Sequence, residues 1–298
     1  MSSPVPILLY HSVSLHTTPQ FRRWAVRPEV FAAHMAYLRG HQYTAITVTQ
    51  LARAMTERNA ALPDRPVVIT FDDGLADFYS GALPVLKEYG LTATLYVTTG
   101  LVENTSRWLS PLGEGARTML TWSQISEIQA NDIECGAHSL SHPQLDIVSS
   151  AAARAEIVRS KGELEQRLGR QVATFAYPYG YYSAAVRRYV QEAGFMSACA
   201  VKHAMSATDD DRFALARIVV TDTDESDLGG FSGLLGGNGL AVAPKGEQLR
   251  TRGWRAVRRT TFLVGRHSPL LSILVAQVAG MIGIVRHTLM LGVTVQTL

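Results

Sequence analysis

Short apolar runs alternate with amphipathic stretches from Ile7 to Val220, and this alternation constrains the fold more than any other feature. The apolar runs have the length and residue types of buried strands, whereas the stretches between them repeat apolar residues every three or four positions, as helices do. The predicted strands are 7–10, 67–71, 95–98, 133–137, 172–176, 196–200 and 218–220, and the predicted helices are 28–38, 76–89, 123–129, 151–168 and 182–193. Because strands joined through helices pair in parallel, this order predicts an α/β protein, with a barrel as the expected architecture.

The composition allows a large core and excludes several classes of protein. Of the 298 residues, 47% are hydrophobic, and 28 Lys and Arg against 25 Asp and Glu give a formal net charge of +3. This apolar content excludes a disordered protein. Because positive and negative charges are nearly balanced, a nucleic-acid partner is not expected. Cys135 and Cys199 lack a metal-binding spacing, so two free thiols in a reducing compartment are expected. Residues 1–10 do not have the pattern of a signal peptide, and we therefore expect a cytoplasmic location.

The chain changes character after residue 228, so we expect a main domain over 1–228, a glycine-rich flexible linker over 229–244 and a tail over 245–298. Between Lys245 and Arg266 the tail holds seven basic residues and one acid, and residues 268–285 carry no charge. Three alternatives remain for the tail: a membrane anchor, an amphipathic helix that packs on the barrel, and a poorly ordered extension. A basic flank beside an apolar run suits an anchor at the inner, anionic face of a membrane.

Two adjacent carboxylates, Asp72 and Asp73, stand directly after the strand predicted at 67–71. In α/β folds the carboxyl ends of strands are where active sites are built, so this pair is a candidate for catalysis. A turn followed by a helix N-cap would explain the same residues without any catalytic role.

His138 and His142 follow the strand predicted at 133–137, four positions apart. Two imidazoles at this spacing share one face of a helical turn and can bind one metal ion, although a surface or core role is the alternative. With Asp73 they would form a two-histidine, one-carboxylate set that leaves positions open for water, and Asp72 would be available as a base. A divalent cation is therefore the expected cofactor, with Zn²⁺ the default and Co²⁺ or Ni²⁺ equally compatible with the ligands.

Residues 177–180, Tyr-Pro-Tyr-Gly, follow the strand predicted at 172–176. Proline and glycine alone would explain a strand-to-helix turn here. The functional alternative is a rigid loop in which the backbone N–H of Tyr179 faces a developing oxyanion. Trp108 and Trp122 are either platforms for a sugar ring or partly buried core residues.

These three motifs, in this order, resemble those of the polysaccharide deacetylases, the carbohydrate esterases with a NodB-homology domain. Residues 70–74 match the first motif, T-F-D-D-G, unchanged; residues 134–145 look like the second motif, and residues 175–180 are similar to the third. The resemblance covers roughly residues 4–220. It implies a distorted (β/α) barrel of seven or eight strands that removes the N-acetyl group of an amino sugar by means of metal-activated water.

The resemblance also assigns roles by position. Asp72 corresponds to the general base, Asp73, His138 and His142 to the metal ligands, and the N–H of Tyr179 to part of the oxyanion hole. One departure is Ala176, which stands where many members carry an arginine paired with the base. We expect Arg217 to take over that pairing; the alternative is a solvated arginine at a strand end.

The second departure is the missing C-terminal motif whose histidine protonates the leaving amine. His11, after the strand predicted at 7–10, resembles the Tyr-His motif of the deacetylases that act on poly-N-acetylglucosamine. Because the leaving amine needs a proton donor near neutral pH, we predict His11 to be the acid, with a capping or packing histidine as the alternative.

The expected function is removal of N-acetyl groups from a glycan or glycoconjugate that contains N-acetylhexosamine. A hydrolase of small amides or cyclic imides would use the same chemistry, and release of acetate distinguishes the two. A catalytically weak protein that binds glycans or membranes is the third alternative. The loss of the third-motif arginine favours it, whereas the retained base and ligand set oppose it.

Overall fold

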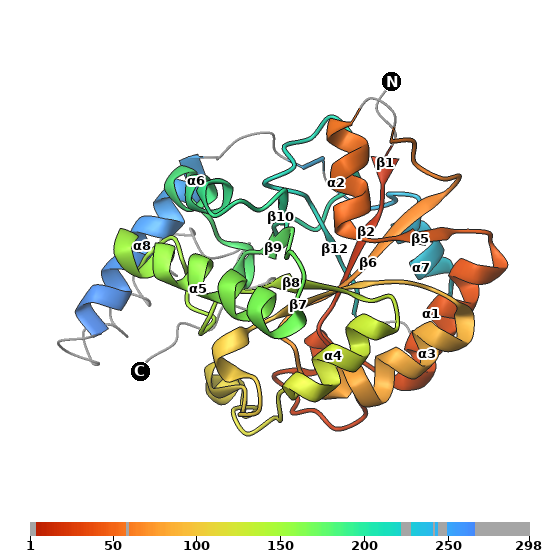
Figure 1. Cartoon of the computed structure of the whole chain (residues 1–298), viewed down its shortest axis with the longest axis horizontal. Helices are drawn as coiled ribbons and strands as arrows, with labels where there is room; N and C mark the ends of the chain where they lie inside the picture. The colour runs from red at the N-terminus through yellow and green to blue at the C-terminus, as the bar shows by residue number, and fades with distance from the viewer. Residues whose placement is uncertain (1–3, 58–59, 222–227, 241, 244–248, 266–298) are drawn as a thin grey trace.

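A curled parallel sheet surrounded by helices forms the body of the protein in the computed structural model, which describes residues 4–57, 60–221, 228–240, 242–243 and 249–265 (Figure 1). The strands lie in the order β10–β9–β8–β7–β6–β2–β12, and β5 pairs with the first part of β6. Their bounds are β2 Ile7–Tyr10, β5 Thr44–Ile46, β6 Pro66–Phe71, β7 Thr94–Val97, β8 Glu134–Ala137, β9 Thr174–Ala176, β10 Ser197–Cys199 and β12 Ile218–Val219. Every pairing within this sheet is parallel, as the alternating sequence predicts.

The two edges of the sheet meet at one point. Leu215, just ahead of β12, forms an isolated bridge with Cys199 of β10, and the N–H of Ala200 donates to its carbonyl at 2.8 Å. Three residues later, Ile218 of β12 pairs with Leu8 of β2. The sheet therefore curls into the distorted barrel that the sequence predicts. Both Cys135 and Cys199 are buried and form no disulfide.

Helices cover the outside of the sheet, and their ends follow local capping rules. Their bounds are α1 Pro28–Gly40, α2 Val48–Thr56, α3 Leu83–Tyr89, α4 Trp122–Ala130, α5 Ser150–Leu168 and α6 Ala184–Glu192. Capping boxes begin α2 and α4, where Thr47 and Thr121 each exchange hydrogen bonds with a glutamine three residues later. Left-handed Gly90 and Gly169 end α3 and α5.

Two differences from the predicted elements have local causes. The helix predicted over 76–89 is divided into a π-helical turn, Phe78–Ala82, and α3. Pro84 lacks a backbone N–H and so interrupts the regular α-helical bonding at this junction. The strand β5 escaped prediction because it has only three residues of mixed polarity.

The segment predicted as a flexible linker begins instead with a helix, α7, Leu228–Leu235. Its Phe231 side chain stacks on the His34 ring of α1, with ring centroids 4.0 Å apart, and Tyr37 donates to Ser232 at 2.8 Å. Apolar residues at helical spacing therefore outweigh the glycines that suggested flexibility.

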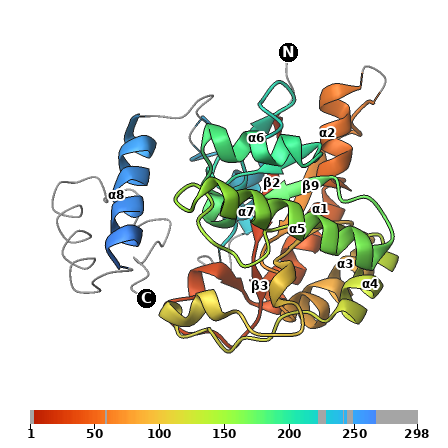
Figure 2. The same cartoon turned by 60° about the vertical axis from the view of Figure 1, so that its left-hand side comes forward.

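The basic part of the tail forms a second C-terminal helix, α8, Leu249–Gly265, at the side of the body (Figure 2). Among the described helices, none has the length and apolar character needed to cross a membrane. The uncharged run at 268–285 lies outside the described residues.

Candidate active site

The predicted site residues converge on one pocket at the carboxyl ends of the sheet strands. His11 follows β2, Asp72 and Asp73 follow β6, His138 follows β8, and Tyr179 lies in the loop after β9. The pocket is lined by His11, Phe21, Trp24, Asp72, Asp73, Trp108, Leu109, Pro111, Leu112, His138, His142, Gln144, Tyr179, Gly180, Tyr181 and Val201. Aromatic rings thus surround a small group of buried titratable side chains.

Asp73, His138 and His142 form the tightest cluster in this pocket. All three are buried, and one potential ligand atom from each lies within 4.8 Å of the others. The Nε2 atoms of His138 and His142 lie 3.6 Å and 3.3 Å from Asp73 Oδ1. Hydrogen bonds from both imidazoles outweigh burial and hold the pKa of Asp73 well below its usual range.

The backbone fixes the tautomer of His138. Its Nδ1 lies 2.8 Å from the carbonyl oxygen of Ala176, which can only accept a hydrogen bond. Nδ1 therefore carries a proton, which leaves Nε2, 3.6 Å from Asp73 Oδ1, as the nitrogen that could bind a metal ion. Outer hydrogen bonds of this kind orient imidazoles that bind metals.

The backbone around these residues is strained. Asp73, Ser139, His142 and Tyr179 all have positive φ values, between 58° and 77°, in the left-handed region. Residues 138–142 form no helix, so the helical turn expected from the histidine spacing is wrong. The histidines meet because Ser139 and His142 turn the chain, at a cost of about 1–3 kcal/mol for each such residue. Strain of this kind is concentrated at functional sites.

Arg217 lies beneath the pocket and contacts Asp72 through a bidentate ion pair. Its Nη1 and Nη2 atoms donate to the two carboxylate oxygens at 2.6 Å and 2.7 Å. The alternative of a solvated arginine is wrong, because Arg217 is fully buried and also donates to Thr70 and to the carbonyl of Ala200. Burial raises the pKa of Asp72, but Arg217 and His138 lower it more, so the carboxyl stays ionised at neutral pH.

His11 lines the same pocket as the two carboxylates. Burial lowers its pKa, and the charges of Asp73 and Asp72 oppose that shift. Its ring packs on Trp24 with centroids 4.9 Å apart. Sequence reasoning missed Trp24, since nothing in its neighbourhood marks it except its aromatic character.

Of the two tryptophans considered for sugar binding, only Trp108 lines the pocket. Its ring stacks on His142 at 4.7 Å, and Tyr179 contacts the same imidazole edge-on at 4.7 Å. Trp122 begins α4, where the Arg167 guanidinium lies over its ring. Trp108 therefore packs against His142, a candidate metal ligand, and also forms part of the pocket wall.

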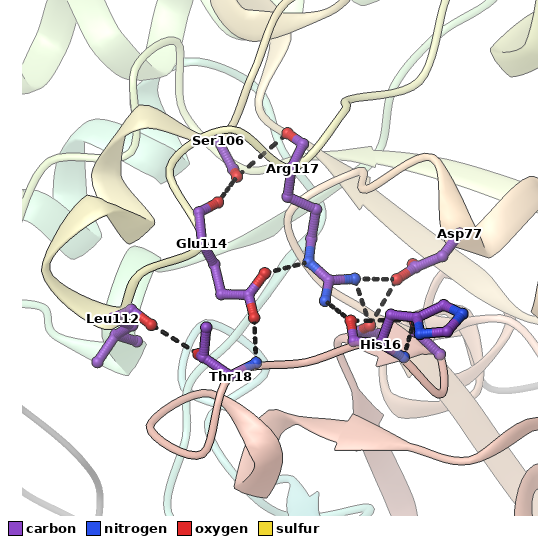
Figure 3. Close-up of polar contacts among 9 residues, drawn as sticks. His16, Thr18, Asp77, Ser106, Leu112, Glu114 and Arg117 are labelled. Atoms are coloured by element: carbon purple, nitrogen blue, oxygen red, sulfur yellow. Dashed lines mark hydrogen bonds and ion pairs between the residues drawn. The ribbon is translucent and has the colours of Figure 1, made fainter.

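A partly buried polar network holds the remaining wall of the pocket together, with Arg117 at its centre (Figure 3). Arg117 donates to Asp77 at 2.7 Å, to the His16 carbonyl at 2.8 Å and to Glu114 at 3.2 Å. Glu114 in turn accepts from the N–H of Thr18. The network thereby joins the segment after His11 to the loop that carries Trp108. Burial raises the pKa of Asp77 to about 6, against the opposing effect of its partners.

We expect Arg117→Met to lower the free energy of unfolding by about 3 kcal/mol at pH 8, because it leaves the Asp77 carboxylate buried without its cation. The loss should be smaller at pH 5. Without Arg117 the pKa of Asp77 in the folded protein rises further above its unfolded value, so the folded state binds a proton more tightly and stability falls as pH increases. Urea unfolding at the two pH values measures this. In Arg117→Met/Asp77→Asn the pH-dependent part should vanish; an equal loss at both pH values would contradict the explanation.

The comparisons with known proteins agree with this site. Residues 59–198 match the family model described as polysaccharide deacetylase, a stretch that contains all three motifs. YxkH of Bacillus subtilis strain 168, which carries the name of this family, is 26% identical over 217 residues, covering 73% of this chain and 71% of its own. A poly-β-1,6-N-acetyl-D-glucosamine N-deacetylase of Staphylococcus epidermidis is 22% identical over 218 residues, with coverage of 70% and 72%.

A solved structure shares the fold. The deacetylase PplD of Streptococcus pyogenes, determined in complex with acetate, superposes with a TM-score of 0.65 at 24% identity, covering 75% of this chain and 95% of its own. The motifs, the barrel and the family match lead to one conclusion: the chain contains a polysaccharide deacetylase domain, which the family model matches over residues 59–198.

Proposed function

We propose that this protein is a metal-dependent N-deacetylase that acts on a glycan or glycoconjugate containing N-acetylhexosamine. The observation that carries the proposal is the juxtaposition of a buried, ionised carboxylate, Asp72, with the group formed by Asp73, His138 and His142. The Staphylococcus epidermidis relative, which is named as a poly-β-1,6-N-acetyl-D-glucosamine N-deacetylase, supports the same class of substrate.

The donor set fits a divalent first-row cation. Two imidazoles and one carboxylate are the ligands of many catalytic zinc sites, and cobalt or nickel would accept them as well. The hydrogen bond of His138 Nδ1 to the Ala176 carbonyl suits this role, since it leaves Nε2, 3.6 Å from Asp73 Oδ1, as the atom that would bind the cation. When bound, such a cation supplies Lewis acidity toward the amide carbonyl and makes water a stronger nucleophile.

The residues of this chain supply the proton transfers. Asp72 takes a proton from the attacking water, and Arg217 keeps it ionised for that purpose. His11 donates a proton to the nitrogen that leaves. The N–H of Tyr179 stabilises the oxyanion. One water is consumed: a C–O bond forms, the amide C–N bond breaks, and acetate and a free amine result.

The first test is release of acetate from N-acetylhexosamine substrates before and after the metal is removed. We expect chelation to lower the rate at least about a hundredfold, because both the Lewis acid and the activated water are lost. Adding back Zn²⁺, Co²⁺ or Ni²⁺ separately should restore activity and would identify the preferred ion.

Two other outcomes would replace the proposal. Bound metal with no acetate from any sugar, but turnover of small amides or cyclic imides, would indicate the related hydrolase. A protein that binds no metal and turns over neither class would be a binding protein with the same fold.

A further inference from the structure

The helix α8 lies against the pocket, although it is far along the chain from all three motifs. Its buried side chains are Trp254, Arg258 and Thr261, each 6% exposed, at the spacing of one helical face. This face contacts the loop that follows His142 and the loop that follows Tyr179. The basic residues of the tail thus include at least one that is internal to the structure.

Arg258 makes the main contacts in this interface. Its Nη1 and Nη2 atoms donate to the two carboxylate oxygens of Asp146 at 2.9 Å and 2.6 Å, and Nη1 also donates to Gln144 Oε1 at 2.7 Å. The side chain of Asp146 is 1% exposed and that of Arg258 is 5% exposed. A bidentate pair with this burial fixes both partners in one geometry.

The same arginine supports an aromatic ring of the pocket. The Arg258 guanidinium lies 3.7 Å from the ring centroid of Tyr181, and Trp254 Nε1 donates to the Tyr181 hydroxyl at 3.3 Å. The Tyr181 ring is nearly parallel to Tyr179, with centroids 6.3 Å apart, and Tyr179 contacts His142. A series of rings therefore leads from the candidate metal ligands to α8.

Gln144 and Tyr181 both line the pocket, and Arg258 holds both. We propose that these two residues form a distal subsite for a further sugar unit of the substrate, and that α8 builds this subsite, with Arg258 as its positioning residue. An aromatic ring and an amide that contact the same guanidinium offer apolar surface and hydrogen bonds, which a pyranose needs. This inference rests on the proposed function, because it assumes that the pocket takes a glycan.

The test compares chain lengths of the substrate in the full-length, metal-loaded protein. Asp146→Asn/Arg258→Met removes the two most buried charges together, whereas Arg255, which also donates to Asp146 at 3.1 Å, is 20% exposed and stays. Exposed Arg259→Ala on the same helix is the matched control. KM and kcat are measured with the N-acetylglucosamine monomer and with its β-1,6-linked tetramer. Hydrogen exchange of residues 140–146 and 178–182 reports the docking of α8 independently of activity.

We expect the double variant to raise KM for the longer oligomer about tenfold, with kcat within about twofold and the monomer unaffected. Exchange should increase in both segments, and Arg259→Ala should behave like the wild type. Unchanged exchange, an unchanged KM for the longer oligomer, or an equal rise for both substrates would each overturn the subsite while leaving the deacetylase intact. A wild type that turns over no glycan would instead remove the proposed function and the subsite together.

Discussion

Replacing Asp72 by Asn is expected to lower kcat for deacetylation about a thousandfold, a loss within the range for removal of a general base. Asn has the shape of Asp but cannot accept the proton of the attacking water. Because Asp73, His138 and His142 are unchanged, the variant should bind the same amount of metal. Steady-state acetate release and metal analysis of the same preparation measure the two properties.

The matched control is His142→Ala, which should lose activity and metal together. The pair of variants separates the base from the ligands, since both change the same pocket but only one changes the donor set. If Asp72→Asn kept more than a tenth of the wild-type kcat, Asp72 would not be the base. If it lost its metal, the two carboxylates would have to share the ligand role.

The second large effect concerns stability. We expect Arg217→Met to lower the free energy of unfolding by about 3–5 kcal/mol, because the carboxylate of Asp72 would stay buried without its only bidentate partner among the described contacts. Arg217→Lys should recover only part of this loss, since an ammonium group cannot form two parallel hydrogen bonds with one carboxylate. Urea unfolding at neutral pH gives the values.

A double-mutant cycle tests the cause. Asp72→Asn/Arg217→Met removes both charges, so it should be more stable than Arg217→Met alone despite carrying one more substitution. Additive losses, or a loss below about 1 kcal/mol in Arg217→Met, would mean that the ion pair contributes little to the fold.

The sequence was sufficient to locate the chemical groups, because each follows a strand that its apolar run makes recognisable. His11, Asp72, His138 and Tyr179 all lie at strand ends, and a parallel sheet brings such ends to one edge. Arg217 could be predicted as the partner of Asp72, because Ala176 occupies the position where many family members carry the pairing arginine. The contact between Arg217 and Asp72 is present in the structure. The catalytic roles of the site residues stay predictions.

What the sequence did not predict depends on contacts between distant segments. Nothing near Arg117 indicates that it joins Asp77 to the His16 carbonyl, since these partners lie 40 and 101 residues away. A helix that packs on the barrel was one of three alternatives for the tail, but only the fold shows that Arg258 of α8 contacts Asp146. Local sequence patterns predict helices and strands, whereas contacts between residues far apart in the chain become visible only in the folded structure.

The place where the barrel closes has a consequence for how such a protein can lose its activity. In the part of the chain that the structure describes, β10 meets the segment before β12 at one isolated bridge, between Cys199 and Leu215. Two residues further on, Arg217 reaches across to Asp72 after β6. Through Arg217, the proposed base Asp72 therefore also stabilises the place where the two sheet edges meet. If a relative of this protein lost the reaction, replacement of Asp72 alone would leave Arg217 buried without its anion. Arg217 would then have to change as well, or the barrel would become less stable. Replacement of both Asp72 and Arg217 would therefore mark a homologue of this fold that has lost the reaction.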